Sequence, residues 1–80
     1  MEDEDVMNRI NELAQEEHDL FSRESQGEIS PRERERLKWL EVRLDQCWDL
    51  LHQRRALRRA GLDPEAAKVR DEETVEGYLN

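Results

Sequence analysis

The feature that most constrains this chain is a helix start at Ser30-Pro31-Arg32-Glu33, followed by a long stretch without a helix breaker. Serine at the N-cap accepts a hydrogen bond from an unpaired backbone N–H, and a glutamate three residues later bonds back to the cap. Proline fits the first helical position because its missing N–H would have no partner there. Neither glycine nor proline recurs before Gly61. We therefore expect one helix over residues 31–60, about 30 residues and roughly 45 Å long.

An apolar stripe predicts another helix over residues 5–24. Its members are spaced by four and three residues, as on one face of an α-helix: Val6, Ile10, Leu13, Glu17 and Leu20. The acidic residues at positions 2–5 lie in or before the first turn, where the helix dipole favours negative charge. Gly27 suits the left-handed turn that ends a helix.

The connection over residues 25–30 is short enough to leave the two helices antiparallel and adjacent. The second helix carries a matching stripe, which we call the seam: Leu37, Leu40, Leu44, Cys47, Trp48 and Leu51. Folding the chain at the turn sets Leu13 near Leu44. The sequence thus predicts an all-α fold, a coiled-coil-like antiparallel two-helix hairpin over residues 1–61.

Residues 62–80 form a segment of different character. Asp63-Pro64-Glu65 repeats the pattern of a cap followed by proline, which predicts a short helical turn over residues 64–68. The acidic tail beyond it lacks helical periodicity, and we expect it to be irregular. Its apolar residues are available for packing: Val75, Tyr78 and Leu79.

The second helix is apolar on two sides. At about 100° per residue, four residues fall opposite the seam, and we call them the second face: Trp39, Val42, Leu50 and Leu57. Isolated exposed apolar residues are ordinary, but a row along one helix favours a partner surface. Either a second copy, completing a four-helix bundle, or the chain's own C-terminal tail would cover it. We favour the homodimer, because a chain of 80 residues buries little apolar surface alone.

Charge and cysteine content narrow the partners and the compartment. The net charge of −8 disfavours nucleic acid and anionic membrane, because both present negative phosphate groups. The sequence has no run of about 18 apolar residues, so we expect no membrane span. Cys47 is the only cysteine and has no partner for an intramolecular disulfide, which fits a reducing, cytoplasmic setting.

A basic run near the end of the second helix is the main argument for nucleic acid: Arg54, Arg55, Arg58 and Arg59. Arginine-rich helices of this kind bind RNA phosphates. Antiparallel pairing, however, brings residues 2–5 beside residues 52–55, so the acidic start of the chain neutralises part of this basic patch. The stems of Arg54 and Arg58 also continue the seam and cover apolar surface. A nucleic-acid-associated regulator is therefore the alternative hypothesis, behind charge complementarity within the fold and an acidic protein partner.

Catalytic and metal sites have little support in the sequence. Glu17 interrupts the apolar stripe, and Arg36 and Arg43 are placed to pair with it. An ion pair, or a carboxylate that extends from the stripe to solvent, is therefore a simpler role than a metal ligand or a raised-pKa acid. Cys47 lies among leucines, as an apolar filler does, and the two histidines do not complete a zinc set with it. We expect no enzyme activity, no metal and no cofactor.

The stretch from Leu44 to Ala56, LDQCWDLLHQRRA, resembles the signature of a family of short actinobacterial proteins described as a domain of unknown function. The likeness extends through Glu16-Glu17-His18, the turn Gly27-Glu28-Ile29-Ser30 and an ending like Val75-Glu76-Gly77-Tyr78-Leu79. It implies no activity, cofactor or catalytic residue. It does draw attention to one polar and aromatic group on the second helix: Asp45, Gln46, Trp48 and Asp49.

These features predict a non-enzymatic helical protein that acts through self-association and protein–protein interaction. Its second face is the expected interface and its exterior is acidic. No motif in the sequence names the biological process or the partner.

Overall fold

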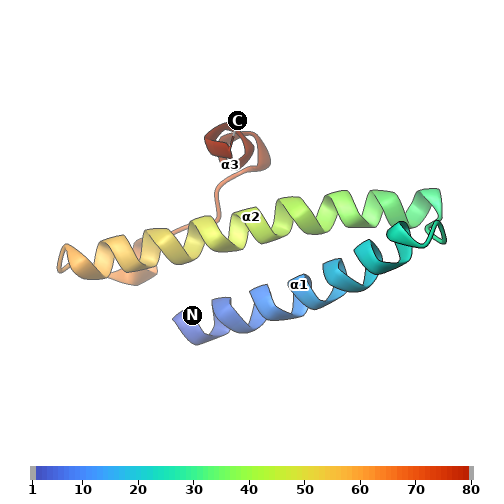
Figure 1. The fold of residues 1–80 in the computed structure, drawn as a ribbon. Helices are drawn as coiled ribbons and strands as arrows, with labels where there is room; N and C mark the ends of the chain where they lie inside the picture. Colours follow the sequence, from blue (N-terminus) through green and yellow to red (C-terminus); the bar gives the residue numbers. More distant parts are fainter. Residues whose placement is uncertain (1, 80) are drawn as a thin grey trace.

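The computed structural model describes residues 2–79, with side chains described for residues 2–77. Its elements are α1 (Asp3–Ser25), α2 (Pro31–Arg59), the 3-10 turn η1 (Pro64–Ala66) and α3 (Glu72–Leu79). The helices α1 and α2 run antiparallel from a tight turn, which confirms the predicted all-α hairpin (Figure 1). No β-strand occurs within residues 2–79.

Reciprocal caps fix where both long helices begin. The Ser30 hydroxyl accepts from the Glu33 N–H at 3.2 Å, and the Glu33 carboxylate accepts from the Ser30 N–H at 3.1 Å, as predicted. The helix α1 begins two residues before the predicted start, because Asp5 makes the same kind of bond and accepts from the Glu2 N–H at 2.9 Å. Gly27 follows α1 with a left-handed φ of 73°.

The core lies between the apolar stripes of α1 and α2. Its most deeply buried members are Leu40 and Leu51, which have no exposed surface. The other members come from the predicted stripes of both helices: Val6, Ile10, Leu13, Leu20, Leu37 and Leu44.

Trp48 is a correction to the predicted seam, because 40% of its surface is exposed and its ring lies beside His52. Trp48 projects about 200° around α2 from Leu50. The C-terminal segment packs on the Leu50 side, and Leu50 joins the core with 6% of its surface exposed. Trp48 therefore lies on the flank of α2 that this segment leaves uncovered.

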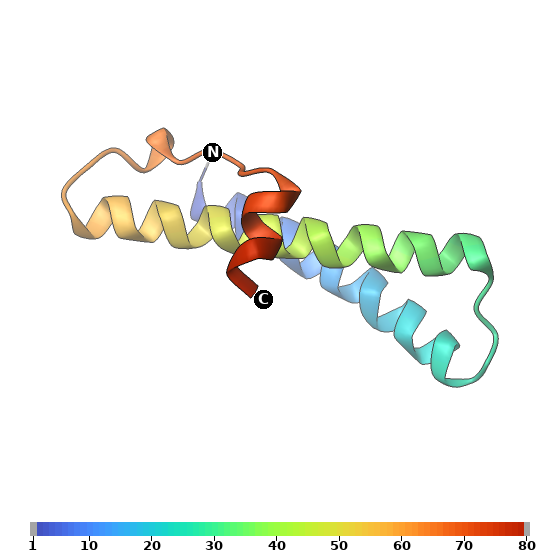
Figure 2. The same cartoon turned by 90° about the horizontal axis from the view of Figure 1, so that it is seen from above.

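The C-terminal segment turns back after α2 and crosses it on the side away from α1 (Figures 1 and 2). The 3-10 turn η1 is shorter than the predicted turn over residues 64–68, and Asp63 caps it by accepting from the Glu65 N–H at 3.0 Å. The prediction of an irregular tail is wrong, because residues 72–79 form α3. Asp71 accepts from the Thr74 N–H at 2.8 Å, which starts this helix, and Val75 is 3% exposed.

An extended stretch over residues 67–71 joins η1 to α3 and follows the surface of α2. Two glutamines of α2, seven residues apart, donate hydrogen bonds to its backbone carbonyls. Gln53 binds the Lys68 oxygen at 2.8 Å, and Gln46 binds the Arg70 oxygen at 3.1 Å. Between them, Asp49 forms an ion pair with Arg70 at 3.4 Å. These bonds satisfy polar groups that the segment would otherwise remove from water.

Replacing the cap serine tests how much the start of α2 contributes to stability. We expect Ser30→Ala to lower the free energy of unfolding by about 1 kcal/mol, because the Glu33 N–H loses its acceptor. Urea unfolding followed by circular dichroism measures this change. The matched control is Ser22→Ala on the exposed surface of α1, which should change stability by no more than a few tenths of a kcal/mol. Equal losses in the two variants would contradict the role of the cap.

Candidate functional site

The four residues of the second face do not share one environment. Leu50 is buried against the C-terminal segment, with Ala67 packed on the same core. Val42 and Leu57 are half-buried, and 36% of the surface of Trp39 is exposed. The C-terminal segment of the same chain therefore covers Leu50. This is one of the two covers that the sequence predicts for the second face, the other being a second copy. The suggestion that Tyr78 and Leu79 cover this face concerns side chains outside the described residues.

Trp39 lies between two guanidinium groups. The Arg36 guanidinium carbon is 4.3 Å from the centre of the Trp39 ring and that of Arg43 is 4.9 Å from it. Both distances are within the range of cation–π attraction. The stack holds the indole in place although it is partly exposed. We call Arg36, Trp39, Val42 and Arg43 the Trp39 surface.

Of the two roles expected for Glu17, the ion pair with Arg36 or Arg43 is wrong, and a half-buried carboxylate at the edge of the core remains. Arg36 binds the neighbouring Glu16 instead, through two bonds of 2.9 Å, and Arg43 donates to the Gln46 side chain at 3.3 Å. The hydrogen bond with Arg36 lowers the pKa of Glu16. Successive residues of a helix point about 100° apart, so Glu16 lies on the flank of α1 that Arg36 reaches, whereas Glu17 points toward α2.

Glu17 is half-buried against α2. Partial burial raises its pKa, and the negative charge of Glu41 on α2 adds to the shift. Both causes make the ionised form less favourable than it is in water. The Glu17 carboxylate therefore lies at the edge of the core with a like charge as its neighbour.

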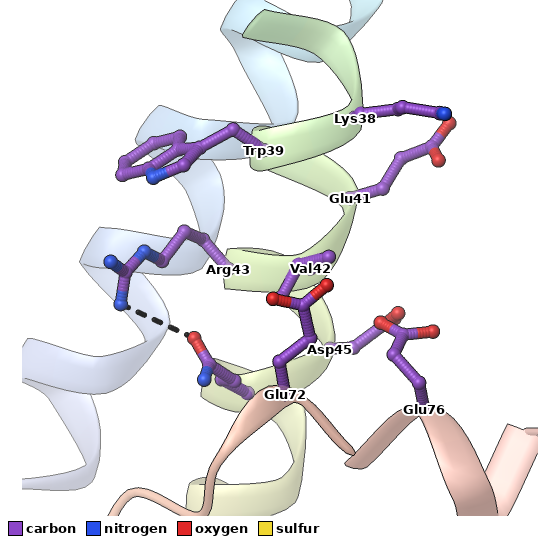
Figure 3. Close-up of a pocket in the computed structure, with 9 residues that line it drawn as sticks. Lys38, Trp39, Glu41, Val42, Arg43, Asp45, Glu72 and Glu76 are labelled. Atoms are coloured by element: carbon purple, nitrogen blue, oxygen red, sulfur yellow. Dashed lines mark hydrogen bonds between the residues drawn. The ribbon is translucent and has the colours of Figure 1, made fainter. Parts of the chain in front are cut away.

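An acidic hollow of about 480 Å³ opens beside the Trp39 surface, between α2 and α3 (Figure 3). We call this site the acidic hollow, because four carboxylates line it, two from each helix: Glu41, Asp45, Glu72 and Glu76. Lys38 and Arg43 are the cations on its wall. A second hollow of about 330 Å³ adjoins Trp39 toward α1, with four apolar or weakly polar lining residues: Leu13, Cys47, Leu50 and Val69.

Asp45 and Glu76 bring two carboxyl groups together across the interface between α2 and α3. Their side chains point toward each other in Figure 3. A hydrogen bond with Asp45 raises the pKa of Glu76, with burial and the charge of Asp45 as further causes. The Oε1 atom of Glu76 is buried without a hydrogen-bond partner. Sequence reasoning missed this pair, because it treated the tail as irregular.

The basic patch is divided by the fold. Arg54 is only 3% exposed; its guanidinium binds Asp3 at 2.7 Å and Glu65 at 3.2 Å. Arg58 binds Asp3 at 2.6 Å. This confirms that the acidic start of the chain neutralises part of the patch. The hydrogen bonds from Arg58 and Arg54 hold the pKa of Asp3 well below its usual range. Arg55 and Arg59 are exposed.

Cys47 is a free, half-buried cysteine, and burial raises the pKa of its thiol. A thiol with a raised pKa is a weak nucleophile at neutral pH. Among the side chains that the structure describes, no three histidine, cysteine or acidic residues are grouped so as to hold a metal ion. Within the same residues, no helix combines the length and the apolar character that a bilayer crossing requires.

Three polar residues of α2 have roles that the sequence did not assign: Gln46, Asp49 and Gln53. Their spacing of three and four residues places them in one row along the helix. The sequence marked Gln46 and Asp49 only as part of a polar and aromatic group. Their regular spacing is the signal that could have indicated a polar contact line, but both glutamines bind backbone carbonyls, which carry no sequence signature.

The pairing of Asp3 with two arginines gives a pH dependence with a definite sign. The unfolded chain takes up the proton near the ordinary pKa of 3.8, whereas folded Asp3 takes it up only at much lower pH. The stabilisation is therefore complete above pH 3.8 and is lost as the pH falls below it. We expect Asp3→Asn to lower the melting temperature by several degrees, because buried Arg54 loses a charged partner.

Melting of wild type and Asp3→Asn should differ by a constant amount from about pH 8 to pH 5 and converge at lower pH. The control is Glu4→Gln in the same turn of α1, whose side chain is exposed and should contribute little. A difference that grows on acidification would contradict the assignment.

Comparison with known proteins places this chain among relatives of nearly the same length. The family described as "Protein of unknown function (DUF2630)" matches residues 2–80. The uncharacterized proteins Rv0898c of Mycobacterium tuberculosis H37Rv and Mb0922c of Mycobacterium bovis are each 47% identical to it over 77 residues, which cover 95% of this chain and 88% of each relative. No solved structure shows a significant match. With a family match over almost its whole length, the chain belongs to the DUF2630 family.

Proposed function

We propose that this chain is a non-enzymatic interaction protein that associates with a second copy of itself through the Trp39 surface. The observation that carries the proposal is the partly exposed indole of Trp39, held between Arg36 and Arg43 on a rigid helix. Tryptophan and arginine are the residue types most enriched among the energetically dominant contacts of protein interfaces. Because the indole is already held in place, burying it on association costs little side-chain entropy.

The charges around Trp39 favour a second copy as the partner. In a two-fold dimer, each surface must complement itself, because a contact from one residue to another occurs twice. Arg43 and Trp39 lie on one side of Val42, and the carboxylates of the acidic hollow lie on the other (Figure 3). A two-fold axis near Val42 would set the cations of each copy against the carboxylates of the other.

Apolar contact would come from the centre of this surface. Val42 is half-buried, and the second hollow, of about 330 Å³ beside Trp39, adds further apolar area. Leu50 contributes only through the wall of that hollow, because the chain itself buries it. Leu57 lies about five turns along α2 from Trp39, outside the centre of the proposed contact.

The basic patch gives weaker support to nucleic-acid binding. Affinity for nucleic acid depends on cations free to neutralise phosphates. Arg54 is buried, and Asp3 binds both Arg54 and Arg58. Two exposed arginines on a chain of net charge −8 make a poor phosphate surface.

Sedimentation velocity across micromolar concentrations tests the interface. We expect wild type to dimerise and Trp39→Ala to raise the dissociation constant at least about tenfold. Trp48→Ala is the matched control, because Trp48 is similarly exposed on the opposite side of α2. Circular dichroism verifies that both variants fold. A monomeric wild type, or a larger loss from Trp48→Ala than from Trp39→Ala, would reject the proposal.

A charge-swap pair tests the two-fold arrangement itself. Arg43→Glu and Glu72→Arg should each weaken self-association, because each sets like charges against one another in its own dimer. Mixed together, they should form a heterodimer in which opposite charges meet at both contacts. Native mass spectrometry distinguishes the mixed dimer from the two parents. Failure of the mixture to regain dimer would contradict the pairing of these two sides.

A further inference from the structure

The helix α3 is weakly attached to the rest of the fold. Within the described residues it contacts α2 and no other helix. Val75 is its one buried apolar side chain among those described, and the extended stretch before it is held at Arg70 by Gln46. An element with so few buried contacts opens locally at a much lower free-energy cost than the whole domain. A small change in charge at its interface is therefore enough to move it.

The interface between α2 and α3 is rich in carboxylates. Glu41 and Asp45 of α2 and Glu72 of α3 line the same hollow as Glu76. Of the two cations on its wall, Arg43 donates to Gln46, and Lys38 extends beside Glu41, away from Glu76 (Figure 3). The net charge facing Glu76 is therefore negative.

Asp45 and Glu76 point their carboxyl groups toward each other across this interface (Figure 3). Glu76 keeps one oxygen buried without a partner, and a hydrogen bond with Asp45 raises the pKa of Glu76. The two carboxyl groups are therefore placed to share one proton. Two carboxylates that face each other repel strongly when both are ionised. The closed position of α3 therefore contains one proton that the open position does not need.

We propose that α3 is a proton-operated latch on α2, closed when Asp45 and Glu76 share a proton and opened when both are ionised. Closure takes up one proton per chain from solvent, and opening returns it. The sign follows from the raised pKa of Glu76 in the closed state. Closure strengthens as the pH falls toward 4.5, the ordinary pKa of a free glutamate, and weakens as the pH rises.

The hairpin itself stays intact through this pH range. The ion pairs and caps that hold it use carboxylates whose pKa is lowered: Asp3, Glu16 and Glu33. These groups remain ionised at pH 5 and above. Glu17 has a raised pKa like Glu76, so its protonation adds stability to the hairpin on acidification.

The latch stands apart from self-association, since it is a property of one chain. Glu72 and Glu76 line the acidic hollow, which faces Arg43 of the second copy in the proposed dimer. Any coupling of pH to assembly rests on the proposed function, whereas the opening of α3 does not. The full chain carrying Trp39→Ala, which is expected to associate at least about tenfold more weakly and leaves the charges of the hollow unchanged, therefore allows the latch to be measured on the monomer.

Amide hydrogen exchange of α3, measured by NMR on the full chain, tests the latch. The amides of Val75, Glu76 and Gly77 report opening, and their protection factors are corrected for the intrinsic effect of pH on exchange. We expect protection to rise as the pH falls from about 7.5 to about 5, by at most about tenfold per pH unit because closure takes up one proton. Protection in the core of α2 should rise less steeply.

Glu76→Gln should remove this pH dependence, because its amide donates to the Asp45 carboxylate without taking up a proton. Glu73→Gln is the matched control on the same helix, since Glu73 is exposed and does not line the hollow. It should keep the wild-type profile. A wild-type profile that is flat with pH, or an equal flattening by Glu73→Gln, would overturn the latch.

Discussion

Burial of one apolar stripe from each of two helices, between α1 and α2, is the interaction on which every other part of the molecule depends. Isolated helices are marginally stable in water, so each long helix exists because the other covers it. The same packing sets the register. It places Asp3 beside Arg54 near one end of the hairpin, Glu16 beside Arg36 in the middle, and Arg23 beside Glu33 at the turn.

The outer side of α2 is organised by polar contacts rather than by a second apolar core. Gln46 and Gln53 hold an extended stretch by its backbone carbonyls, and that stretch in turn covers Leu50. The cover is incomplete, which leaves Trp39 partly exposed on one side of α2 and Trp48 on the other. One helix thus serves as a core element, as an anchor for the C-terminal segment and as the outer surface of the protein.

The sequence was sufficient for the parts of the fold that depend on local chemistry or on long periodicity. The cap at Ser30, the two stripes and the approach of the acidic start to Arg54 follow from these. Helix α3 was missed, because eight residues are too few to show a helical period, although Asp71 does provide a cap. Arg36 pairs with Glu16 and not with the predicted Glu17. Matching residues at the same height along two helices does not determine on which side of a helix a charge lies.

The contact between Arg54 and Asp3 indicates the order in which the contacts of the hairpin form during folding. Contacts near the turn join residues about ten positions apart, as Arg23 and Glu33 are, whereas Asp3 and Arg54 are separated by 51 positions. Closing a short loop costs less entropy and is faster than closing a long one. Chain entropy therefore favours contact formation from the turn outward, with the Arg54–Asp3 contact among the last. The contact of Arg54 with Glu65 spans only 11 positions and closes a loop as short as the one at the turn. The start of the chain thus joins a charge that the C-terminal segment is able to bind first.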